Sequence, residues 1–131
     1  MIANRSVPTA TVIPELSYED VPAASDWICR AFGFKERLRI GDHRAQLVCG
    51  DGAVILTSRG TPGHSAVLMR VTDADRHHEQ AKRSGAKILQ PPADHPYGER
   101  QYSAEDLGGH VWTFSQSIAD VDPASWGGTL R

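Results

Sequence analysis

The side chains that could bind a metal ion or move a proton are scattered along this chain rather than gathered in a motif. The sequence holds six histidines and sixteen carboxylates, but they form no Ser-His-Asp or Cys-His constellation. His77 and His78 fall in a helical pattern, His95 in a proline-rich loop and His43 in a hairpin turn. These surroundings favour structural or solvated histidines, so spacing alone predicts no catalytic centre.

Composition excludes several classes of protein. The 131 residues suffice for one domain or two small, closely packed modules. The net charge of −2 and the lack of a Lys/Arg cluster predict no nucleic-acid partner. No apolar run is long enough to cross a membrane and the first residues lack a signal-peptide core, so we expect a cytoplasmic protein. Cys29 and Cys49 lack CxxC spacing, which predicts buried free thiols.

The chain contains a weak internal duplication. The segment "LSYEDVPAASDWICRAFGFK" aligns with "MRVTDADRHHEQAKRSGAK", which places Asp20 on Asp73. Further on, "DGAVILTS" aligns with "GGHVWTFS". Both halves follow the order strand, helix, strand, strand, strand.

Local signals place the elements of each half. In the first half, Asp20 is a helix N-cap, Pro22 fits the first turn and Gly33 ends the helix. Asp73 and Gly85 play the same parts in the second half. The predicted strands are residues 11–18, 34–40, 44–49, 53–58, 64–71, 86–90, 100–104 and 110–115. We expect a long loop over residues 91–99.

These elements predict one domain over residues 1–116, with modules at 11–58 and 64–116 and a linker at 59–63. Residues 117–131 are polar and glycine-rich, and we expect a mostly irregular tail.

The order of these elements, with the motifs "AASDWICRAFGFKE", "YGER" and "DLGGHVWTF", resembles the vicinal oxygen chelate superfamily. This superfamily includes glyoxalase I, bleomycin-resistance proteins, fosfomycin-resistance enzymes and extradiol dioxygenases, and its PhnB-like or bleomycin-resistance-like branch is most similar. The resemblance implies an α+β fold in which two tandem βαβββ modules form a curved, cup-shaped mixed sheet with helices on the outer face. It also implies a homodimer.

In metal-dependent members of this superfamily, each module supplies one ligand from its first strand and one from its fourth. Carried over by motif spacing, the resemblance places these positions at Ile13, Leu56, Ala66 and Thr113. Aliphatic side chains cannot bind a divalent ion, and a threonine hydroxyl is a weak ligand. The resemblance therefore predicts vacant metal positions and no cofactor.

Strand alternation from these positions predicts what else faces the cup. Val54 and Val111 would add to an apolar wall, and Arg100 and Tyr102 would lie at the cup mouth with Tyr97. The predicted ligand-binding residues are Glu15, Ser17, Leu56, Leu68, Arg70, Arg100, Tyr102 and Thr113. Two structural alternatives stay open: a salt bridge between Glu15 and Arg70, and a role for Arg100 in hairpin and dimer packing. His110 is predicted to hydrogen-bond as a structural residue on the helix side.

An apolar cup with a few polar groups predicts a metal-independent protein that binds a small, mostly apolar molecule, with sequestration as one role. A second hypothesis is a lyase or isomerase of the same superfamily. It would use Glu15 as general acid or base, or a relocated metal site with His64. A third is a structural or regulatory partner domain.

Overall fold

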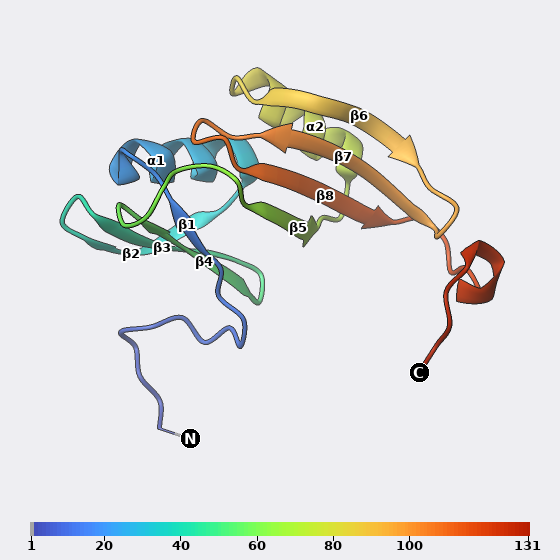
Figure 1. Cartoon of the computed structure of the whole chain (residues 1–131), viewed down its shortest axis with the longest axis horizontal. Coiled ribbons are helices and arrows are strands. Elements are labelled where there is room, and N and C mark those ends of the chain that lie inside the picture. Colours follow the sequence, from blue (N-terminus) through green and yellow to red (C-terminus); the bar gives the residue numbers. More distant parts are fainter. Residues whose placement is uncertain (1) are drawn as a thin grey trace. The chain divides into compact units, whose positions relative to one another are not determined.

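The computed structural model describes residues 2–131, which form two compact units (Figure 1). Unit one comprises residues 2–65 and 107–110, and unit two comprises residues 66–106 and 111–131. The chain order is β1 (Glu15–Ser17), α1 (Val21–Phe32), β2 (Lys35–Ile40), β3 (Arg44–Cys49), β4 (Gly52–Thr57), β5 (Ala66–Arg70), α2 (Ala74–Arg83), β6 (Lys87–Asp94), β7 (Glu99–Glu105), β8 (Val111–Ser117) and the 3₁₀ helix η1 (Pro123–Trp126). The predicted α+β fold with two βαβββ modules is confirmed.

In unit one, a four-stranded mixed sheet has the order β1-β4-β3-β2, with β1 parallel to β4 and the other pairs antiparallel. The helix α1 packs on one face. It begins as predicted, because the Asp20 carboxylate accepts a hydrogen bond from the Ala23 amide. It ends at Gly33, whose φ of 81° is a left-handed conformation that glycine adopts without steric cost.

The core of unit one is mostly aliphatic. Leu16, Leu47 and Leu56 from the sheet and Ile28 and Phe32 from α1 are all at most 2% exposed. These are the positions that alternation along a strand and the 3.6-residue helix period bring to one interface. Burial of this interface stabilises the unit through the hydrophobic effect.

Unit two repeats the topology, with the order β5-β8-β7-β6 and β5 parallel to β8. The Asp73 carboxylate caps α2 by accepting from the Arg76 amide, and Gly85 follows the helix with a φ of 88°. Both predicted helix boundaries are therefore confirmed.

The core of unit two is built from aromatic rings. Tyr102, Trp112 and Phe114 are at most 1% exposed, and the Tyr102 and Phe114 rings are stacked 5.0 Å apart. The Trp112 indole N–H donates to the Asp106 carboxylate at 2.9 Å, which satisfies its polar edge inside the core. The buried residues of α2 are small, Ala74 and Ala81, so the large rings of the sheet fill the space beneath it.

Two predicted irregular segments are partly ordered. Residues 91–94, expected in a loop, extend β6, and the sheet register shifts between Gln90 and Ala93 around the two prolines. Because β6 is an edge strand, its prolines remove few ladder hydrogen bonds. In the tail, η1 is capped by Asp122, and the Trp126 ring lies 5.3 Å from that of Tyr97.

Cys29 and Cys49 are free thiols as predicted, but both are half-buried rather than buried. Among the helices of residues 2–131, none is long and apolar enough to span a membrane.

Candidate functional site: the open sheet faces

We define the open face of each sheet as the face opposite to its helix. In unit one, residues on the open face follow from the strand register: Glu15 pairs with Ile55, and Ser17 pairs with Thr57. Leu56 instead pairs with Leu16, and both side chains are buried against α1. The prediction that Leu56 lines the site is therefore wrong, and Val54, which pairs with buried Leu47, is also on the helix side.

The error comes from the length of one turn. In unit one, Cys49 pairs with Gly52 across a tight two-residue turn, whereas in unit two Glu105 pairs with Val111 across a longer connection. Counting from the turn glycine therefore shifts the register by one residue, and a one-residue shift moves a side chain to the opposite face. The second count is correct, because Thr113 pairs with Leu68 on the open face.

The metal that the superfamily implies does not fit this set of residues. The open-face positions of the first and fourth strands of each module are Glu15, Ser17, Ala53, Ile55, Thr57, Ala66, Leu68, Arg70, Val111, Thr113, Ser115 and Ser117. Their only carboxylate, Glu15, is ion-paired with Arg44 at 2.6 Å. Within residues 2–131, no group of three or more His, Cys, Asp or Glu side chains is arranged to hold a metal. Ile13 precedes β1 and is half-buried.

The open face of unit two combines an exposed apolar patch with a hydrogen-bonded polar row. Leu68 is 65% exposed, and its neighbours Ala66 and Arg70 are exposed too. The polar row consists of the contacts Ser103–Thr113 at 2.9 Å, Tyr97–Gln101 at 3.0 Å, Gln101–Ser115 at 3.0 Å and Ser115–Glu99 at 2.6 Å. Most of these polar groups are thus oriented by one another beside the apolar patch.

Glu99 is the charged member of this row. Hydrogen bonds from Ser115 and Ser117, and to a lesser degree the positive charge of Arg70, lower the pKa of the Glu99 carboxyl below its ordinary value. Arg70 also donates to the Ser117 hydroxyl at 2.5 Å. The face therefore presents a carboxylate and a guanidinium near its apolar patch.

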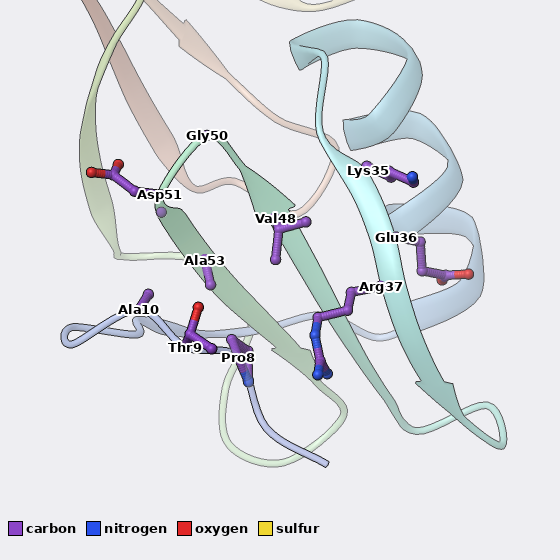
Figure 2. A pocket seen from close by; sticks show the side chains of 11 residues that line it. Pro8, Thr9, Ala10, Lys35, Glu36, Arg37, Val48, Gly50, Asp51 and Ala53 are labelled. Atoms are coloured by element: carbon purple, nitrogen blue, oxygen red, sulfur yellow. The ribbon is translucent and has the colours of Figure 1, made fainter. Parts of the chain in front are cut away.

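The open face of unit one carries part of the chain itself. The Arg37 guanidinium and the Gln46 amide donate to the carbonyls of Arg5 and Ser6, at 2.5 Å and 2.9 Å. Beside this contact lies a pocket of about 460 Å³ (Figure 2). Its lining includes Pro8, Thr9, Ala10, Lys35, Arg37, Val48 and Ala53 and the β3–β4 turn.

Two predicted ligand-binding residues lie on the wrong side of the sheet. Tyr102 is 1% exposed, and its hydroxyl lies 2.5 Å from Nδ1 of His77 on α2. Arg100 donates to Asp94 at 2.7 Å and to Asp75 on α2 at 3.0 Å. The hydrogen bond from Arg100 lowers the pKa of the Asp94 carboxyl. These contacts tie the β6–β7 hairpin to the helix, so Arg100 packs the hairpin rather than lining the open face.

The polar groups of the open faces have partners within each unit. Glu15 pairs with Arg44 in unit one, and Arg70 bonds to Ser117 in unit two. The salt bridge between Glu15 and Arg70 stays a prediction. His110 is fully buried, and its Nε2 lies 2.7 Å from the Ser17 carbonyl, which confirms a structural hydrogen bond.

Sequence reasoning missed the polar row of unit two. Its signal was present, because Glu99, Gln101 and Ser103 alternate with residues that face α2. The motif "YGER" contains Arg100, whose side chain lies on the opposite face, toward α2. The N-terminal contact with Arg37 and Gln46 had no signal in the sequence, since it joins segments about thirty to forty residues apart.

Comparison with known proteins places this chain in a family. The family model "Glyoxalase/Bleomycin resistance protein/Dioxygenase superfamily" matches residues 10–114. The crystal structure of TioX from Micromonospora sp. ML1 is 38% identical, with a TM-score of 0.74, over 82% of this chain and 98% of that chain. The structure of a lactoylglutathione lyase from Agrobacterium tumefaciens shares the fold at 16% identity and a TM-score of 0.71, over 85% of this chain and 96% of that one.

An uncharacterized protein of Mycobacterium tuberculosis is 25% identical over 130 residues, covering 83% of this chain and 75% of its own length. The family model alone spans most of the chain, from the segment before β1 into β8. This chain therefore belongs to the glyoxalase, bleomycin resistance protein and dioxygenase superfamily.

Proposed function

We propose that this protein binds a small, mostly apolar molecule on the open face of its second sheet, without a metal, and that sequestration is its role. The observation that carries the proposal is the pairing of exposed Leu68 with the adjacent polar row. Small-molecule sites are typically apolar surfaces with a few fixed polar groups that orient the ligand. This face has both parts.

Each part of the face has a separate task. Leu68, Ala66 and Val111 offer apolar surface, whose removal from water contributes about 25 cal/mol per Å². Thr113 and Gln101 have their partners within the row, so they are held in place before a ligand arrives. Such preorganisation lowers the entropic cost of binding.

The lack of suitable metal-coordinating side chains on the open faces supports metal independence. A divalent ion needs several imidazole or carboxylate groups, and Glu15 on the open face already has Arg44 as a partner. His64 is exposed and precedes β5 with a φ of 67°, so it does not continue the strand toward Ala66. These observations weigh against a relocated metal site.

The enzymatic alternative requires a carboxyl group in an apolar environment. The Glu15 side chain is 55% exposed and ion-paired with Arg44, so it does not have that apolar environment. We therefore favour binding over lyase or isomerase chemistry.

The superfamily resemblance also supports a homodimer, which we propose for this chain. Light scattering across a range of protein concentrations tests it directly. A mass of one chain at every concentration would contradict the dimer.

The binding proposal is tested with a small apolar probe, 1-anilinonaphthalene-8-sulfonate, followed by its fluorescence. We expect Leu68→Asp to weaken binding at least roughly tenfold, because the charge would have to be buried under the probe. The control is Leu130→Asp, which changes an 81% exposed leucine in the tail and should leave binding unchanged. EDTA should have no effect on the wild type.

Two results would contradict the proposal. Equal probe affinity in Leu68→Asp and the wild type would place the site elsewhere. Loss of binding in EDTA that is restored by Zn²⁺ or Mn²⁺ would show a metal-dependent site.

A further inference from the structure

The segment Arg5–Ala10, which we call the N-terminal strap, lies on the open face of the first sheet. It has no regular secondary structure, yet its Pro8 is buried. Figure 2 shows Pro8, Thr9 and Ala10 around the same pocket as Arg37 and Ala53. The strap is therefore packed onto the sheet rather than extended into solvent.

Two side chains of the sheet hold the strap by its backbone. Arg37 donates to the Arg5 carbonyl and Gln46 donates to the Ser6 carbonyl. The same two side chains bond to each other, from Arg37 to Gln46 Oε1 at 2.6 Å. Because Gln46 is only 3% exposed, its amide depends on these partners to offset the cost of burial.

These hydrogen bonds are made to the backbone of the strap and not to its side chains. Carbonyl groups are the acceptors, and Pro8 supplies a compact apolar contact at the pocket. The strap precedes nearly all of the family match, which begins at residue 10. All of the strap except Ala10 therefore lies outside the matched residues, and it covers part of the open face of the first sheet.

We propose that the N-terminal strap is a removable cover, which closes the open face of the first sheet until a ligand displaces it. The gating part of this inference rests on the proposed binding function, whereas the docking part stands alone. A cover held by two side-chain hydrogen bonds and one proline opens at a modest energetic cost, so displacement is within reach of a small ligand. The apparent affinity for this face is reduced by the fraction of time that the strap is closed.

Docking is tested by limited proteolysis, because trypsin cleaves after Arg5 only when the strap is released. The measured quantity is the initial rate at which the fragment ending at Arg5 appears, followed by mass spectrometry. We expect Gln46→Ala and Arg37→Ala each to raise this rate roughly tenfold, through loss of a hydrogen bond to the strap. Gln90→Ala, which changes an exposed glutamine in unit two, is the matched control and should cleave like the wild type.

Gating is tested by comparing the full chain with a variant that lacks residues 2–10, after circular dichroism shows that the variant folds. The probe is again 1-anilinonaphthalene-8-sulfonate. We expect the shortened protein to show binding at least about fivefold tighter, or an additional site, because the face is open in every molecule.

The outcomes separate the two parts. Wild-type cleavage after Arg5 as fast as in a free peptide of residues 2–10 would overturn docking. Probe binding that is the same with and without the strap would overturn gating, even if the Leu68→Asp result supports the second sheet as a binding face. A failure of Leu68→Asp to weaken binding concerns unit two alone, so it can be distinguished from a failure of docking or of gating.

Discussion

The two modules share one topology, but the side chains on their open faces differ in exposure. In the first sheet, Gln46 is 3% and Ala53 6% exposed, and the N-terminal strap lies on the face that they share. In the second sheet, the corresponding face leaves Leu68 65% exposed. Antiparallel pairs allow either outcome, since one face of such a sheet can meet water. The modular repeat therefore specifies the sheets, and in unit one a short N-terminal segment covers part of the open face.

Their cores differ as well. The first module packs an apolar helix stripe on leucines, whereas the second packs small alanines of α2 over Tyr102, Trp112 and Phe114. A repeat can thus keep its strand order while large side chains move from helix to sheet. Total core volume matters more than which element supplies it.

The largest expected effect tests the register difference between the modules. Leu56→Ala should lower the free energy of unfolding by about 2–5 kcal/mol, because Leu56 is fully buried. Thr113→Ala, on the open face, should cost only about 1 kcal/mol, for one lost hydrogen bond to Ser103. Urea unfolding followed by circular dichroism measures both. Similar losses at the two positions would break the comparison.

The aromatic core predicts an alkaline weakness of the second module. Burial raises the pKa of the Tyr102 phenol, so the folded state favours its neutral form. The stability that depends on neutral Tyr102 is fully present below the unfolded pKa of about 10. It is lost as the pH rises from there toward the folded pKa. Between about pH 8 and 11, the free energy of unfolding should fall less steeply in Tyr102→Phe than in the wild type. Parallel profiles would contradict the assignment.

The helix caps should behave alike in both modules. Asp20→Ala and Asp73→Ala each remove a carboxylate that accepts from the first helical turn, so each should cost about 1 kcal/mol. Hydrogen exchange of the amides in α1 and α2 localises the loss to the mutated module. Glu19→Ala, beside the first cap, is the control. A loss confined to one module would show that the caps are not equivalent.

The smallest effect concerns the polar row of the second sheet. Ser115→Ala removes the main hydrogen bond to Glu99, so the pKa of that carboxyl should rise toward its ordinary value. Carboxyl titration by NMR detects this change, with Ser125→Ala in η1 as the control. An unchanged pKa of Glu99 would show that the hydrogen bond from Ser115 does not stabilise this carboxylate.

Local signals predicted the fold well. The caps at Asp20 and Asp73, the glycine after each helix and the strand β3 agree with the structure, because each depends on neighbours in the sequence. The open-face positions of Glu15, Ser17, Leu68, Arg70 and Thr113 follow from strand alternation in the same way. Predictions failed where one residue of turn length reversed the face, as at Leu56.

By itself, the sequence determined the duplicated order of elements, the helix ends and the absence of metal-ligating residue types from the expected positions. These properties depend on residue type and on neighbours a few positions away. Only the tertiary structure decided that Tyr102 and Arg100 face α2, that Glu15 pairs with Arg44 and that Gln46 holds the strap. Such contacts join distant segments, and their geometry depends on strand register and packing, which short-range patterns do not encode.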